Sequence, residues 1–242
     1  MLRIFASLII ALLATQAGAT DLKVLSSNGT AAIVAELGWQ FERATGHKLA
    51  IRYDTAVLIQ KEIERGETFD VAVLTTSVID ALAASGKVGM RAEIARSGIG
   101  VAVRRGAQKP DISTAEAFRQ AMLNAKSIAY TTVGGSGLHF ISVCERLGIA
   151  GEVKAKGRTQ PGGATGDLVA RGEAEIAIQQ ISELLPVEGI DLVGPLPPEL
   201  QLITRFSAGA GTSAADAAAA FVKFLAAPEA APVIMAKGMQ PG

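Results

Sequence analysis

Four short segments of the sequence carry small, hydroxyl-bearing side chains just before a stretch with helical spacing, and two of them also contain glycine. The four segments cover residues 26–30, 54–56, 75–77 and 131–137. A helix N-terminus leaves about four backbone N–H groups unpaired and carries a partial positive charge, so an anion binds there readily. Small side chains let the anion approach, and hydroxyls donate further hydrogen bonds. Turns of this kind around one cleft would therefore bind a small anion.

The alternative is that these residues only cap helices, because Ser, Thr and Asn are preferred at N-caps. Several such turns in one chain favour a ligand site, since ligands of open parallel sheets bind beyond the carboxyl ends of the strands. The ligand-binding residues expected from these turns are Ser26, Ser27, Asn28, Gly29, Thr55, Thr75, Thr76, Thr132, Gly135, Ser136 and Gly137.

Four more residues carry useful chemistry. Arg158 ends a predicted strand and can bind a carboxylate through two parallel hydrogen bonds, unless it is a solvated surface arginine. Gln180 follows another predicted strand and offers amide donors, unless it only begins a helix. His139 and Glu183 are the candidate catalytic groups for proton transfer if the protein is an enzyme. For His139 the alternative is helix capping or solvent exposure.

The composition excludes several function classes. The 242 residues hold 23 basic and 23 acidic side chains, and this balance argues against binding the phosphate backbone of nucleic acids. The single cysteine, Cys144, and the two histidines, His47 and His139, are too few for a zinc cluster. The glycine run at 134–137 has the spacing of neither a dinucleotide-binding fingerprint nor a Walker loop. We expect no metal, no cofactor and no nucleic-acid partner.

The first nineteen residues have the pattern of a secretory signal peptide. Arg3 gives a positive start, residues 4–14 are almost wholly apolar, and Ala17 and Ala19 occupy the small-residue positions before a cleavage site. A membrane anchor is the alternative, but it needs an apolar run of about 20 residues. We expect cleavage after Ala19 and a location in the periplasm.

Predicted strands and helices alternate through the rest of the chain. The first series has strands at 22–25, 49–53 and 70–74, and helices at 31–45, 58–65 and 77–85. After a strand at 98–103, a second series has helices at 114–124, 138–147 and 165–171, and strands at 127–130, 153–158 and 174–179. A strand at 203–208 and helices at 214–226 and 229–237 follow. This alternation predicts an α/β fold with mostly parallel sheets flanked by helices.

The sequence resembles type II periplasmic solute-binding proteins, in the molybdate-binding branch. The resemblance rests on the strand-Ser-Ser-Asn-Gly-Thr-helix opening and on residues 41–46, 67–74 and 82–88. It implies two lobes joined by two crossing hinge strands, with the ligand between them. Lobe 1 would hold residues 20–100 and 205–242, and lobe 2 residues 101–204. In place of the tyrosine that molybdate binders carry after the last strand of lobe 2, this chain has Gln179-Gln180.

Other segments are more similar to bacterial aconitate isomerases, which are built on the same fold and interconvert cis- and trans-aconitate. The matching segments are residues 106–113, 169–174, 179–184 and 189–194, and Arg158 also aligns with an arginine there. The resemblances leave two main hypotheses and one remoter one open. The first, which we favour at this point, is a monomeric periplasmic receptor that captures a small anion, an oxyanion such as molybdate or an organic polycarboxylate, for an ABC transporter permease. The second is an aconitate isomerase, and a remoter third is a module that feeds a sensor protein.

Overall fold

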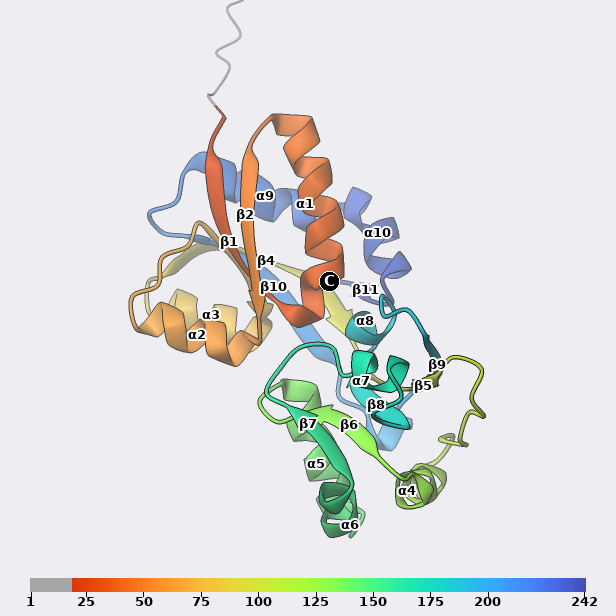
Figure 1. Cartoon of the computed structure of the whole chain (residues 1–242). Helices are drawn as coiled ribbons and strands as arrows, with labels where there is room; N and C mark the ends of the chain where they lie inside the picture. The colour runs from red at the N-terminus through yellow and green to blue at the C-terminus, as the bar shows by residue number, and fades with distance from the viewer. Residues whose placement is uncertain (1–18) are drawn as a thin grey trace, which may run out of the picture.

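The computed structural model describes residues 19–242 and consists of two β-sheets, each flanked by helices (Figure 1). Almost all of the expected signal peptide, residues 1–18, lies outside the described residues, so its cleavage site stays a prediction. Within residues 19–242, no single helix is long and apolar enough to cross a bilayer; α9 (Asp216–Leu225) and the segment Pro228–Ala236 meet the length and composition criteria only as a pair bent by 55°. The buried residues of α9 pack in the core of the first lobe.

The first sheet has the strand order β11-β4-β10-β3-β1-β2. Its strands are β1 (Asp21–Ser27), β2 (Lys48–Asp54), β3 (Val71–Thr75), β4 (Val88–Ser97), β10 (Thr204–Gly211) and β11 (Gln240–Pro241). The helices of this lobe are η1 (Asn28–Thr30), α1 (Ala31–Thr45), α2 (Ala56–Glu64), α3 (Thr76–Ala84), α9, η3 (Pro228–Ala230) and α10 (Ala231–Ala236).

The second sheet has the strand order β7-β6-β8-β5-β9. Its strands are β5 (Ile99–Arg104), β6 (Ile128–Thr131), β7 (Gly157–Gln160), β8 (Ile176–Gln180) and β9 (Ile190–Pro195). The helices of this lobe are α4 (Ala115–Asn124), α5 (Gly135–Arg146), α6 (Ala150–Ala155), α7 (Gly166–Ala170), α8 (Ile181–Leu184) and η2 (Pro198–Leu200).

Most strands of each sheet run in the same direction, but the first sheet also contains the antiparallel strands β10 and β11, and the second contains the antiparallel strand β5. β1 pairs in parallel with β2 and β3, while β10 lies antiparallel between β3 and β4. In the second sheet β6 pairs in parallel with β7 and β8, while β5 lies antiparallel between β8 and β9. The carboxyl ends of β1, β2 and β3 therefore meet at one edge, where the small polar turns follow.

Helix α1 shows how the sequence builds the first lobe. Ile33, Leu37 and Phe41 repeat at helical spacing and are almost completely buried against the sheet, and the rings of Phe41 and Phe221 lie 4.9 Å apart. Gly46 ends the helix with φ of 79°, a left-handed conformation that only glycine adopts at little cost. The same apolar periodicity predicts α1 correctly over 31–45.

Two crossings join the lobes. β4 passes into β5 with only Gly98 between them, and residues 196–203 return the chain from β9 to β10. The two crossings are hydrogen-bonded to each other, because the Gln201 amide accepts from Ile99 N at 2.8 Å and donates to Ile99 O at 2.9 Å. The strands of the first sheet thus come from residues 21–97 and 204–241, on either side of those of the second.

The structure differs from the sequence prediction at one strand, and it contains elements that were not predicted, among them β4. Residues 153–158 are not one strand: α6 ends at Ala155 and β7 begins at Gly157. The cause is that Ile149 and Val153, four residues apart, are both fully buried, which is helical spacing. The long strand β4 was not predicted, because Arg91, Glu93 and Arg96 interrupt its apolar pattern.

Candidate functional site

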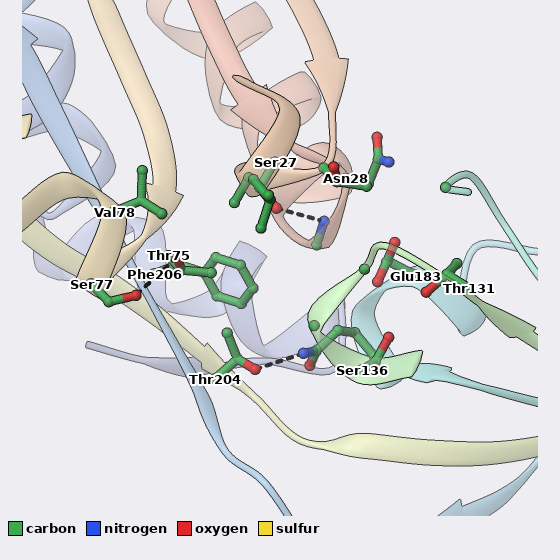
Figure 2. Close-up of a pocket in the computed structure, with 18 of the residues that line it drawn as sticks. Ser27, Asn28, Thr75, Ser77, Val78, Thr131, Ser136, Glu183, Thr204 and Phe206 are labelled. Carbon is green, nitrogen blue, oxygen red and sulfur yellow. Dashed lines mark hydrogen bonds between the residues drawn. The ribbon is translucent and has the colours of Figure 1, made fainter. Parts of the chain in front are cut away.

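A cavity of about 710 Å³ lies between the two lobes, within the range typical of sites for small organic ligands. Figure 2 shows Ser27 and Asn28 on one side, Ser136 and Glu183 on the other, and the Phe206 ring between them. The sequence-predicted residues that line it are Ser27, Asn28, Gly29, Thr55, Thr75, Thr76, Gly135, Ser136, Gln180 and Glu183.

The end of β1 forms one part of the lobe 1 wall. The Ser27 hydroxyl accepts a hydrogen bond from Gly29 N at 3.3 Å, which fixes the turn that begins η1. A Cβ on Gly29 would lie 2.7 Å from Cζ of Phe206, so only glycine fits there without a shift of that ring. Ser26 faces away from the cavity, where its hydroxyl pairs with that of Thr30 at 3.0 Å.

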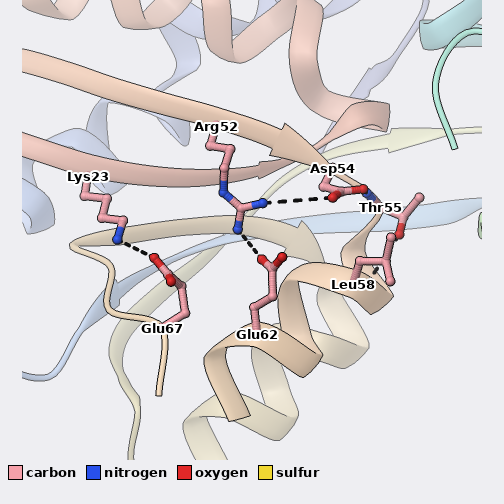
Figure 3. Close-up of polar contacts among 7 residues, drawn as sticks. All are labelled: Lys23, Arg52, Asp54, Thr55, Leu58, Glu62 and Glu67. Carbon is pink, nitrogen blue, oxygen red and sulfur yellow. Dashed lines mark hydrogen bonds and ion pairs between the residues drawn. The ribbon is translucent and has the colours of Figure 1, made fainter. Parts of the chain in front are cut away.

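The N-terminus of α2 forms a second part of this wall. The Thr55 hydroxyl accepts from Leu58 N at 3.3 Å as the N-cap, and its own proton remains available to a ligand. The Asp54 carboxylate accepts from Thr55 N at 2.7 Å, and Arg52 lies between Asp54 and Glu62 (Figure 3). This network of side chains holds Thr55 in place.

The N-terminus of α3 adds hydroxyls to the same wall. Thr75 and Ser77 have their hydroxyl oxygens 3.4 Å apart, and the Thr76 hydroxyl lies 2.9 Å from that of Ser207 on β10. No side chain caps the first amides of α3. The helix start therefore presents both hydroxyls and unpaired N–H groups toward the cavity.

Glu183 is the carboxyl group of the lobe 2 wall. Its Oε1 accepts from Gln179 Nε2 at 2.9 Å, and the backbone of Gln180 also donates to it. The side chain faces the cavity on one side and is surrounded by protein on the others. This burial raises the pKa of Glu183 to about 7, and the two hydrogen bonds offset part of the rise. A carboxyl group with a pKa near neutral exchanges a proton readily at physiological pH.

Gln180 lies at the cavity beside both crossings between the lobes, next to Gly98 and Thr204. With its amide oxygen accepting from the Thr204 hydroxyl at 2.7 Å, its nitrogen lies 3.2 Å from the carbonyl oxygens of Ser97 and Gly98. Its amide is thus engaged with the hinge strands, although the residue also lines the cavity.

Five of the predicted residues do not line the cavity. Arg158 is exposed on β7, and its guanidinium donates only to the neighbouring Gly157 carbonyl at 3.4 Å. His139 Nε2 lies 2.8 Å from the Leu200 carbonyl oxygen, and because that oxygen can only accept, Nε2 is the donor. This hydrogen bond links α5 to η2. Thr132 is exposed beside β7, and Gly137 packs against the backbone of β6; Ser26 is the fifth.

The structure adds residues that the sequence reasoning missed. Arg205 and Phe206 reach the cavity from β10, and Gly162 and Gly163 reach it from the loop after β7. The Arg205 guanidinium donates three hydrogen bonds to Glu93, which lowers the pKa of that carboxyl. A strand whose place depends on pairing with distant segments, as that of β10 does, gives no local signal of the ligand site, whereas the Gly162-Gly163 pair was a visible turn signal.

Among the cavity-lining residues the charged side chains are few. Asp80 pairs with Arg91 at 3.3 Å and Arg205 pairs with Glu93, whereas Glu183 has no cationic partner among residues 19–242. Negative charge on a ligand would thus be met mainly by hydroxyls and helix N-termini. Within residues 19–242 no cluster of three His, Cys, Asp or Glu side chains could hold a metal ion.

Two sheets with inserted antiparallel strands, two crossings and a cavity between the lobes define a periplasmic-type binding fold. The chain belongs to the bacterial extracellular solute-binding protein family, whose model matches residues 22–240. The molybdate-binding protein of Azotobacter vinelandii has the same fold, with a TM-score of 0.75 and 20% identity over 90% of this chain and 98% of that one. A putative molybdenum transporter's substrate-binding domain from Clostridium difficile superposes with a TM-score of 0.68 at 13% identity, over 92% and 99% of the two chains.

One relative is much more similar in sequence. An aconitate isomerase from Pseudomonas sp is 39% identical over 233 residues, which cover 92% of this chain and 88% of that protein. The resemblances inferred from the sequence, both to type II binding proteins of the molybdate-binding branch and to aconitate isomerase, are confirmed.

Proposed function

We propose that this protein is an aconitate isomerase that uses Glu183 as its proton-transfer group. The observation that carries the proposal is the partly enclosed Glu183 carboxyl, whose pKa of about 7 suits a group that both accepts and donates a proton at neutral pH. An ionised carboxyl group in the cavity repels an anionic ligand, so simple capture of anions does not explain its presence there. The 39% identity to a named aconitate isomerase supports the same choice.

The reaction needs one base and no outside reagent. Ionised Glu183 would remove a proton from the methylene carbon of cis-aconitate, and the electron pair would delocalise over the three-carbon unit and an attached carboxylate. Protonated Glu183 would return the proton to the carbon at the far end of that unit, so that the double bond moves by one position. Re-formation of the double bond with the other geometry gives trans-aconitate, and atoms and charge balance.

The cavity walls would hold the carboxylates of the substrate. Ser27, Thr55 and Ser136 line it with hydroxyls, and α2, α3 and α5 begin at its edge. Dipoles and hydroxyls attract anions without a full positive charge beside the base. They also favour the negative charge that spreads onto a carboxylate when the proton leaves.

A receptor that captures a small anion for a transporter is the second candidate. The family description as an extracellular solute-binding protein favours it. Export to the periplasm suits both candidates and is supported by the family and by the N-terminal sequence pattern. Under the receptor hypothesis ligand would bind but would leave unchanged, and the partner would be an ABC transporter permease.

The test is turnover by purified protein incubated with cis-aconitate, followed by chromatography of the two isomers. We expect conversion by the wild type, and a loss of about 100- to 10,000-fold in kcat for Glu183→Gln with ligand binding retained. The matched control is Glu188→Gln, which changes an exposed carboxyl a few residues away and should leave turnover intact. Binding of aconitate by the wild type without conversion would establish the receptor instead.

A further inference from the structure

The side chain of Gln179 makes four hydrogen bonds. Its side chain is 1% exposed at the end of β8. Its Oε1 accepts from Thr165 N and from the Thr165 hydroxyl, both at 2.8 Å. Its Nε2 donates to the Gly163 carbonyl at 2.8 Å and to Glu183 at 2.9 Å. Because the backbone N–H of Thr165 can only donate, the orientation of the amide is fixed, and one N–H must point at Glu183.

Three of these four bonds go to the segment that follows β7. This segment leaves lobe 2 and turns toward lobe 1 (Figure 1). Its tip lies close to the opposite wall, since a Cβ added to Gly162 would lie 3.0 Å from Cγ2 of Thr55 and 3.9 Å from Nδ2 of Asn28. We call residues 161–164 the bridging loop. It covers one side of the cavity, and its Gly163 carbonyl shares a single amide group with the Glu183 carboxylate.

We propose that Gln179 is a positioning residue that aims Glu183 at the substrate and favours its ionised form as a base. This inference rests on the proposed isomerase function. The bonds from Gly163 and Thr165 hold the amide in the one orientation that donates to Glu183.

The charges around Glu183 support this reading. Its pKa responds to burial and to the donors at Gln179 and Gln180, and no charged side chain contributes. The other ionisable groups that line the cavity, Asp80 and Arg205, are paired with Arg91 and Glu93. The Gln179 amide is therefore the side chain that favours the ionised form of Glu183.

The experiment follows the titration of Glu183 directly, by carboxyl-carbon NMR of full-length protein labelled at glutamate, with Glu183→Gln used to assign the signal. Gln179→Leu should raise the midpoint by about one to two pH units, the effect of losing a hydrogen bond to a charged group. With a midpoint one unit higher, kcat/KM at pH 7 should fall by about fivefold and recover at higher pH, since about a tenth of Glu183 instead of about half is then ionised. A purely structural role would lower activity equally at all pH values.

The chain offers a matched control. Gln120 donates to Glu116, also four residues away, on the exposed surface of α4, so Gln120→Leu should leave the midpoint of Glu183 unchanged. Thr165→Val removes one of the bonds that orient the amide and should raise the midpoint by less than Gln179→Leu; it carries the test if Gln179→Leu does not fold. An unmoved or lower midpoint in the folded Gln179 or Thr165 variant overturns the inference. Absence of turnover in the wild type refutes the isomerase function separately, because the NMR titration needs no turnover.

Discussion

Replacement of Glu183 by glutamine should make the protein more stable, and the gain should depend on pH. A partly buried carboxyl with a pKa of about 7 instead of the ordinary 4.5 binds its proton more tightly in the folded than in the unfolded state. Between these two values the unfolded chain releases the proton first, so the stability of the wild type falls as the pH rises. At about 1.4 kcal/mol for each pKa unit, the loss reaches at most about 3 kcal/mol above pH 7. Glutamine does not ionise and escapes this loss.

The assay is urea unfolding of wild type and Glu183→Gln at pH 4.5, 6 and 8. The difference in the free energy of unfolding should grow from pH 4.5 to pH 8 by up to about 3 kcal/mol in favour of the variant. Glu188→Gln provides the comparison, because the side chain is exposed and should give a difference that does not change with pH. Parallel pH curves for wild type and Glu183→Gln would show that Glu183 is an ordinary surface carboxylate, and the proton-transfer role would be refuted with it.

Three further predictions test other parts of the structure. Gly29→Ala should cost about 1–3 kcal/mol in thermal unfolding, because the added Cβ meets Phe206 at 2.7 Å, and a second change, Phe206→Leu, should recover part of the loss. Thr131→Val should raise the unfolding temperature, since the buried Thr131 hydroxyl has no hydrogen-bond partner among the described residues; a lower temperature would contradict this. In calorimetric titration with aconitate, Thr55→Val should weaken binding about tenfold, whereas Arg158→Ala, outside the cavity, should not; equal losses would disprove this placement of the ligand.

Local signals in the sequence account for much of this architecture. The apolar spacing of Ile33, Leu37 and Phe41 and the glycine at 46 define α1 without reference to the rest of the chain. The turn residues Ser27 and Thr55 could be predicted at the cavity for a similar reason. Each follows a strand and caps a helix, and strand ends of a parallel sheet share one edge.

What escaped prediction depends on contacts between distant parts of the chain. Arg158 and Arg205 look alike in the sequence, but β10 carries Arg205 to the cavity because it pairs with β3 and β4, more than a hundred residues earlier. β4 is likewise recognisable as a strand only through that pairing. Glu183 was a candidate by residue type, but its raised pKa comes from burial that only the packed lobes provide.

The position of β10 in the first sheet has a consequence for how the molecule is made. This strand lies between β3 and β4, yet it begins at residue 204 of 242. A chain that emerges N-terminus first, from a ribosome or an export channel, can complete β5 to β9 while β3 and β4 lack the neighbour that joins them. The first sheet, whose first strands are synthesised earliest, is therefore completed last. A truncation before residue 204 leaves β3 and β4 without their shared neighbour and exposes strand edges that promote aggregation.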